Sequence, residues 1–190
     1  MTEERADRLA AIPSKSLKDL ISRMRATSDH SKAAYTLPEL LAEQHRREKV
    51  GTFPTVETAQ KIVQLVGESA TGVITYLDVW DAFRPGQPWE AHKSRQEVTN
   101  ALDRVSFYCI RHGLPLLVTL VVNKGQGKLT DDAKDNIFGA AKERGVAVGP
   151  DRDAFIEDQQ QRARALTLEA LPIDDAYWVQ SPHPHSQPMR

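Results

Sequence analysis

One apolar segment constrains the fold of this chain more than any other feature. Residues 114–122, LPLLVTLVV, are apolar and rich in β-branched side chains, and the polar loop NKGQGK, residues 123–128, follows directly. A short apolar run bounded by turn residues is typical of a buried strand. Elsewhere the apolar residues recur at helical spacing. The sequence therefore predicts a mainly α-helical fold with one small β-hairpin, in which Lys128-Leu129 forms a brief return strand.

The expected helices are marked by residues that cap helix N-termini. The pairs Thr36–Glu39 and Ser94–Glu97 match the capping box, in which a hydroxyl and a carboxylate each bind a backbone N–H group of the first turn. Further start signals are Thr55, Thr75 with Asp78, and Thr130. These signals predict helices that begin near residues 37, 55, 76, 95 and 131.

The order of these elements predicts how the 190 residues are organised. Residues 1–50 are expected to form a helical arm, and residues 52–148 a winged-helix-like domain. Residues 149–180 are expected to form a C-terminal helical extension, and the Pro-rich residues 181–190 a disordered tail. This length suits one ordinary domain with appendages.

The composition excludes several classes of protein. No run of about 20 apolar residues is available for a membrane helix, and the charged N-terminus lacks the apolar centre of a signal peptide. A cytoplasmic protein with no membrane partner is therefore expected. A single cysteine, Cys109, excludes an intrachain disulfide and a multi-cysteine zinc cluster. We expect no metal and no cofactor.

Charge is unevenly distributed although the formal net charge is only −1. Residues 84–128 hold seven Lys and Arg against three Asp and Glu, whereas residues 129–190 hold seven against eleven. A local positive block favours a polyanionic partner. The near-neutral total and the acidic C-terminal third favour a protein partner, so both classes stay open.

The sequence Gly127-Lys128 is close to a phosphate-binding loop without matching it. A Walker A loop has glycine five residues before its Gly-Lys pair and a hydroxyl directly after the lysine. Those positions hold Val122 and Leu129. A nucleotide-binding loop is therefore not expected here.

The order helix, short strand, helix, turn, helix, strand, loop is that of a winged helix. In that fold the third helix, here residues 95–112, enters the major groove of DNA, and the loop lies along the backbone as a wing. The candidate DNA-binding residues are Lys93, Arg95, Gln96 and Asn100 at the groove, with Lys124, Gln126 and Lys128 on the wing.

Several observations keep simpler interpretations open. The helix is also consistent with an amphipathic helix whose polar face is solvated, and the loop with an ordinary turn that carries solubilising lysines. Glu97 and Asp103 would repel phosphates unless they point sideways. The turn at residues 84–93 is longer than that of an ordinary helix-turn-helix.

Residues 72–123 resemble a known family of DNA-binding proteins. The stretches GVITYLDVWDAF, SRQEVTNALDRV and GLPLLVTLVVN are similar to the C-terminal winged-helix domain of alkylguanine DNA alkyltransferases and alkyltransferase-like proteins. The resemblance implies a winged helix that binds DNA. Where that family has Pro-Cys-His-Arg, this chain has residues 119–122, Thr-Leu-Val-Val, so neither the acceptor thiol nor its activating histidine carries over.

The remaining reactive and aromatic residues each allow a structural and a functional interpretation. Cys109 lies on the apolar stripe of its helix, where a thiol is inert, although a pair with His112 would be a candidate nucleophile. Trp89 either packs over the inter-helix turn or stacks on a nucleobase. His183 and His185 either bind a metal loosely or belong to a disordered tail.

We therefore expect a non-enzymatic DNA-binding protein of a bacterial regulatory type. A monomer and a homodimer are both compatible with the sequence. The alternative is a protein-interaction or adaptor module on the same winged-helix scaffold.

Overall fold

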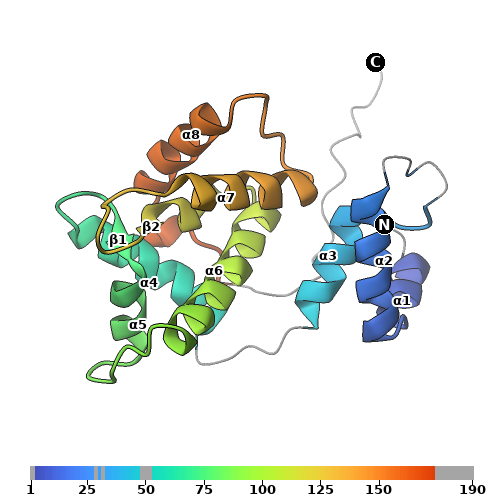
Figure 1. Cartoon of the computed structure of the whole chain (residues 1–190), viewed down its shortest axis with the longest axis horizontal. Helices are drawn as coiled ribbons and strands as arrows, with labels where there is room; N and C mark the ends of the chain where they lie inside the picture. The colour runs from blue at the N-terminus through green and yellow to red at the C-terminus, as the bar shows by residue number, and fades with distance from the viewer. Residues whose placement is uncertain (1–2, 28–29, 31–32, 48–52, 174–190) are drawn as a thin grey trace, which may run out of the picture.

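The computed structural model describes residues 3–27, 30, 33–47 and 53–173, and within them the fold is mainly helical, as predicted (Figure 1). The N-terminal part contains α1 (Glu3–Ala10), α2 (Ser14–Ala26) and α3 (Leu37–Arg46). The rest contains α4 (Thr55–Glu68), β1 (Ile74–Thr75), α5 (Tyr76–Phe83), α6 (Lys93–Arg111), the 3-10 helix η1 (Leu117–Leu120), β2 (Val121–Val122), α7 (Asp131–Glu143), α8 (Arg152–Arg164) and the 3-10 helix η2 (Leu168–Ala170).

Three of the predicted helix starts are confirmed in atomic detail. Thr36 and Glu39 form a capping box, with 2.7 Å from the Thr36 backbone N to Glu39 Oε2. Thr75 and Asp78 form a second, with 2.6 Å between the corresponding atoms. Thr130 Oγ1 accepts from the Ala133 N–H group at 3.1 Å. Each cap satisfies a backbone donor that the helix itself leaves unpaired.

Two predicted caps are wrong. Thr55 is the first residue of α4, and the capping position is occupied by Pro54. Ser94 lies inside α6 and is 1% exposed. Its hydroxyl accepts from the Glu90 N–H group at 2.9 Å and not from the N–H group of Glu97. The carboxylate of Glu97 is used elsewhere, in an ion pair with Arg84. The helix consequently begins at Lys93, two residues earlier than predicted.

The predicted hairpin is replaced by a two-residue parallel pair. Ile74 pairs with Val121 and Thr75 with Val122, so β1 and β2 run in the same direction. Lys128-Leu129 has no strand conformation. Within the described ranges this pair is the whole sheet. Its length is limited at β1, because the capping box at Thr75 starts α5 directly after the strand.

Most of the apolar segment 114–122 is irregular or 3-10 helical because a later helix satisfies its backbone. Gln159 of α8 accepts from the Leu116 N–H group at 2.9 Å, and Gln160 donates to the Thr119 carbonyl at 2.8 Å. Two glutamines therefore take over hydrogen bonds that a neighbouring strand would otherwise supply.

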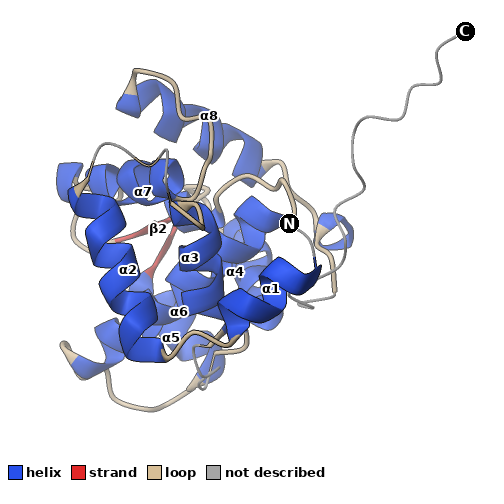
Figure 2. Ribbon diagram, turned by 90° about the vertical axis from the view of Figure 1, so that its right-hand side faces the viewer, coloured by secondary structure: helices blue, strands red, loops and turns tan. Residues whose placement is uncertain are grey.

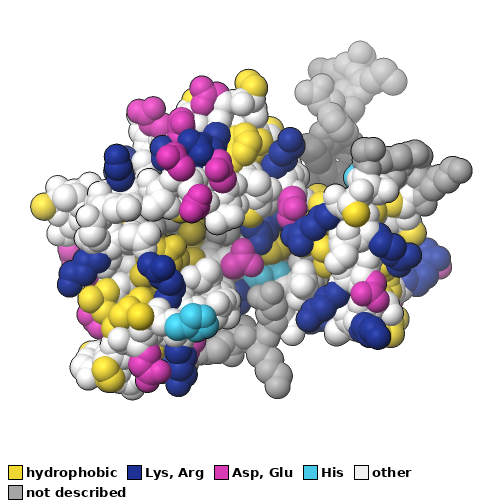
Figure 3. Space-filling model, in the orientation of Figure 1, with side chains coloured by type: hydrophobic (Ala, Val, Ile, Leu, Met, Phe, Trp, Pro, Cys, Tyr) yellow, Lys and Arg dark blue, Asp and Glu magenta, His cyan; other side chains and the backbone are white. Residues whose placement is uncertain are grey.

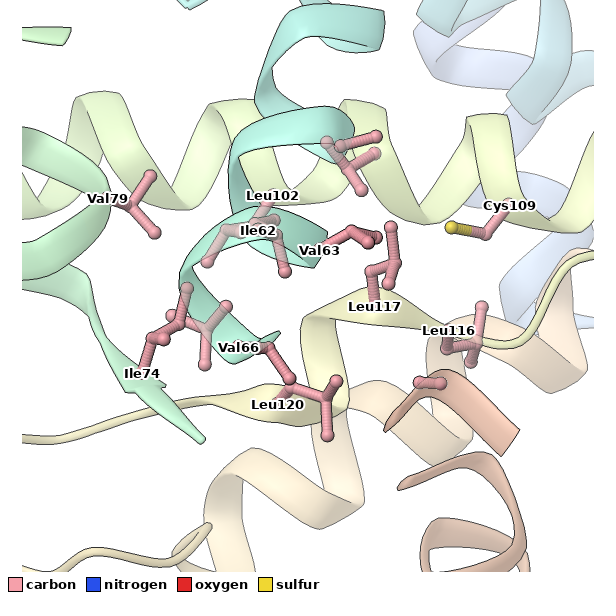
Figure 4. Packing of buried hydrophobic residues seen from close by; sticks show 14 of the residues in the cluster. Ile62, Val63, Val66, Ile74, Val79, Leu102, Cys109, Leu116, Leu117 and Leu120 are labelled. Carbon is pink, nitrogen blue, oxygen red and sulfur yellow. The ribbon is translucent and has the colours of Figure 1, made fainter. Parts of the chain in front are cut away.

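One large hydrophobic core unites α4 to α8. Ile62, Val79, Val98, Leu117 and Leu120 are among its most buried residues, and Figure 4 shows α4, α6 and η1 converging on it. Phe155, Ile156 and Ala163 place α8 in the same core. The helix that the sequence suggested as an extension thus completes the domain that carries β1 and β2.

The first three helices have a smaller core of their own. It consists of Leu9, Leu17, Ile21, Leu40 and Leu41, with Phe107 of α6 packed against it. Figure 2 shows α1, α2 and α3 in front of the strands and the remaining helices.

The contact between these helices and the rest is built around one aromatic ring. Phe107 stacks on His45 of α3, with 4.1 Å between the ring centroids, and the Arg144 guanidinium carbon lies 4.2 Å from the Phe107 centroid. Arg25 of α2 adds an ion pair to Glu143 of α7 at 2.6 Å.

None of the helices that the structure describes is both long enough and apolar enough to span a bilayer.

We predict that Gln159→Ala lowers the free energy of unfolding by about 1–3 kcal/mol, because the buried Leu116 N–H group loses its acceptor. Urea unfolding followed by circular dichroism measures this change. Gln161→Ala, on an exposed position of the same helix, is the matched control and should change stability by less than about 0.5 kcal/mol. Equal stability of the two variants would contradict the role given to Gln159.

Candidate nucleic-acid interface

The first turns of α6 place four candidate residues on the molecular surface. Val98, Ala101, Leu102 and Val105 are buried and fix the inward face of the helix. Lys93, Arg95, Gln96 and Asn100 are all exposed. Lys93, Gln96 and Asn100 lie on the side opposite the buried face, whereas Arg95 lies at the edge of that face. The first turn of α6 contains no acidic residue, so the positive end of the helix dipole is not neutralised within it. These four side chains are therefore accessible, and their contact with DNA stays a prediction.

The loop after β2 carries the other three candidates. Lys124, Gln126 and Lys128 are exposed. The Gln126 N–H group donates to the Asn123 carbonyl at 3.1 Å, which closes a turn, and Gly127 has a φ of 61° that favours glycine. Leu129 is buried and anchors the far end before α7. The loop is therefore a turn between a strand and a helix, and the predicted wing at a hairpin tip is wrong in its topology.

A direct contact joins the helix to the loop. Arg95 Nη2 donates to Asn123 Oδ1 at 2.6 Å, across 28 positions in sequence. The Arg95 guanidinium carbon also lies 5.7 Å from the centroid of the Tyr76 ring at the start of α5. Burial raises the pKa of the Tyr76 hydroxyl, and the positive charge of Arg95 opposes that rise. The N-terminal end of α6 and the beginning of the loop thus lie side by side.

The carboxylates of α6 are occupied within the molecule. Glu97 pairs with Arg84 at 2.7 Å, and Asp103 pairs with Arg144 at 2.5 Å. The two acidic residues that the sequence suggested would oppose DNA therefore have cationic partners.

The lysines of the candidate surface, by contrast, have no carboxylate partner. Lys93, Lys124 and Lys128 form no ion pair with any residue in the part of the chain that the structure describes. The two amides of α6 bond to each other, since Gln96 Nε2 donates to Asn100 Oδ1 at 2.8 Å. The surface around the start of α6 and the loop consequently carries net positive charge.

A groove between α6 and α7 lies beside this surface. Its volume is about 300 Å³. Apolar side chains form its base, including Leu102, Ile110, Val118, Val121, Leu129 and Ile137. Figure 3 shows hydrophobic side chains in the hollow below α7, with Lys and Arg side chains nearby. Sequence reasoning missed this groove, because its walls come from separate segments that no periodicity connects.

Cys109 is confirmed as a buried thiol on the apolar stripe of α6. It is 0% exposed, and burial raises the pKa of the thiol to about 12. The ring of His112 lies against Tyr108, with 4.8 Å between the centroids. A thiol with so high a pKa is almost entirely protonated near neutrality and is a poor nucleophile.

Trp89 packs over the turn, which confirms the structural interpretation. Its ring meets Trp80 edge to face at 5.8 Å between centroids. Arg84 lies 4.7 Å from the centroid of Trp80, and its ion pair with Glu97 ties the turn to α6. The long turn is therefore ordered by aromatic packing that includes Trp89.

No metal centre can be assigned from the described ranges, in which no three His, Cys, Asp or Glu side chains gather closely enough to hold an ion. His183 and His185 lie outside those ranges.

The chain matches no protein-family model, no curated protein and no solved structure. The resemblance of residues 72–123 to the alkyltransferase DNA-binding domain accordingly stays a prediction from sequence.

We predict that Cys109 does not react with a disulfide reagent such as DTNB at mildly alkaline pH in the folded protein, since burial raises its pKa to about 12. In concentrated guanidinium chloride the same thiol should react fully, with one equivalent per chain. Cys109→Ala provides the baseline in both conditions. Complete reaction of the folded protein at the rate of a free thiol would contradict this assignment.

Proposed function

We propose that this protein binds duplex DNA without catalysing a reaction, through the N-terminal turns of α6 and the lysines of the loop after β2. The observation that carries the proposal is the hydrogen bond between Arg95 and Asn123, which joins these two segments into one basic surface. DNA binding places the protein where the DNA is, which in a bacterial cell is the cytoplasm.

The charges on this surface suit a phosphate backbone. Lys93, Lys124 and Lys128 have free ammonium groups, and Arg95 is bonded to a neutral amide. Each cation that meets a phosphate releases condensed counterions, which drives binding at low salt. Because Glu97 and Asp103 are paired with arginines, they oppose this attraction less than unpaired carboxylates would.

The geometry of α6 suits a groove. Residues at the N-terminal end of such a helix contact base edges when the helix enters the major groove. Arg95, Gln96 and Asn100 lie at that end and are exposed. Arginine can bond guanine, and glutamine or asparagine can bond adenine. These residues would supply base contacts while the lysines supply phosphate contacts.

The groove between α6 and α7 favours a second candidate function. A concave apolar surface rimmed by polar side chains is typical of a site that receives a partner, and this groove includes the exposed Asp132 on its α7 wall. An adaptor that docks a protein segment there would need no DNA. Binding to random duplex DNA separates the two functions, because an adaptor should show no affinity even at low salt.

We predict that the double variant Lys124→Glu, Lys128→Glu weakens binding to duplex DNA and flattens its dependence on salt. With the three lysines as phosphate contacts the slope of log K against log salt should be about −2.7, and with Lys93 alone about −0.9. Fluorescence anisotropy with a labelled random duplex at several salt concentrations measures both values.

The matched control is Lys15→Glu, Lys18→Glu, which makes the same change in net charge on exposed positions of α2. Figure 1 shows α2 at the opposite end of the molecule from β2 and the loop. This control should keep the steep slope. An unchanged slope in the Lys124, Lys128 variant would remove the loop from the binding surface.

A further inference from the structure

The parallel strand pair positions two residues, Tyr76 and Asn123, that both contact Arg95. Thr75 of β1 is paired with Val122 of β2, so the residues that follow them, Tyr76 and Asn123, lie at the same end of the pair. Arg95 reaches both from α6, with its Nη2 atom 2.6 Å from Asn123 Oδ1 and its guanidinium carbon 5.7 Å from the Tyr76 ring centroid. Three separate segments of the chain therefore meet at one guanidinium group.

The contacts with Tyr76 and Asn123 hold Arg95 without neutralising its charge. Arg84 and Arg144 are also held in place, but by the carboxylates of Glu97 and Asp103. Arg104 is buried and donates to the Phe53 carbonyl at 3.0 Å. The acceptor for Arg95 is instead the neutral amide of Asn123.

Arg95 consequently keeps most of its capacity to bind a ligand. A guanidinium group has five N–H donors in a planar fork, and the bond to Asn123 uses one of them. The side chain is exposed, so the remaining donors are accessible. Since its position is already restricted, it loses less conformational entropy on binding than a free arginine would.

We infer that Asn123 is a positioning residue that presents Arg95 to the major-groove edge of guanine. This inference rests on the proposed DNA binding. Guanine displays two acceptors there, O6 and N7, which match two parallel donors of the guanidinium fork. The lysines have flexible ammonium groups that suit phosphates and carry no base information. Arg95 is thereby distinguished from the lysines of the basic surface as a cation that reads sequence.

Selection from a random duplex library, followed by sequencing, tests the inference with the full chain. The wild-type protein should enrich guanine at a fixed position. Arg95→Lys keeps the charge and removes the fork. It should therefore retain the salt dependence of binding, while its preference for that guanine falls by about 5- to 150-fold.

Variants of Asn123 separate positioning from a general effect on the fold. Asn123→Ala should reduce the guanine preference by a larger factor than it reduces the affinity for unselected duplex. Asn123→Asp keeps an acceptor for Arg95 but adds a negative charge beside it, so its guanine preference should lie between those of Asn123→Ala and the wild type, while the slope of the salt dependence falls. Gln161→Ala, an amide lost from the exposed face of α8, is the control and should alter neither property.

Two results overturn the inference while leaving DNA binding intact. One is a selection in which no position prefers guanine, and the other is a guanine preference that survives Arg95→Lys. Absence of any binding to duplex DNA at low salt would overturn the proposed function, and this inference with it.

Discussion

The pairing of two residues in β1 with two residues in β2 determines where the candidate site lies. It places Tyr76, the first residue of α5, and Asn123, the first residue of the loop after β2, at the same end of the strand pair. Adjacent side chains of a strand point to opposite faces, so a register shift of one residue would turn Asn123 away from Arg95. The contact between helix and loop depends on this register.

So short a pair needs support from the surrounding structure. Ile74 and Val121 are buried in the large core. The backbone just before β2 is held by Gln159 and Gln160 of α8, which bond to Leu116 and Thr119. The last α-helix that the structure describes, α8, therefore stabilises the segment from which the loop begins.

Local signals allowed much of the secondary structure to be predicted. The capping boxes at Thr36 and Thr75 involve residues three apart, and their hydrogen bonds require no distant partner. The same reasoning failed at Ser94, whose hydroxyl is taken by the Glu90 amide. It also failed for residues 114–122, because the hydrogen bonds that keep this segment from forming a longer strand come from a helix about 40 residues later.

The candidate site could be predicted only in part, because its contacts also join residues that are far apart in sequence. The sequence indicated a positively charged block and its exposed residues, but it did not indicate which of the arginines form ion pairs with carboxylates. The ion pairs of Arg84 with Glu97 and of Arg144 with Asp103 join residues that are 13 and 41 positions apart. Asn123 was seen only as the first residue of a polar loop. Its contact with Arg95 depends on the register of two strands, and no pattern in the sequence specifies that register.

The central claim is that the start of α6 and the loop after β2 form one DNA-binding surface. The most direct test is a titration of the isotope-labelled protein with a duplex about two helical turns long, followed by amide NMR. The account predicts shift changes concentrated in residues 93–100 and 123–128, with α1 and α2 unaffected. Changes centred on α1 to α3, or on one of the two segments without the other, would contradict it.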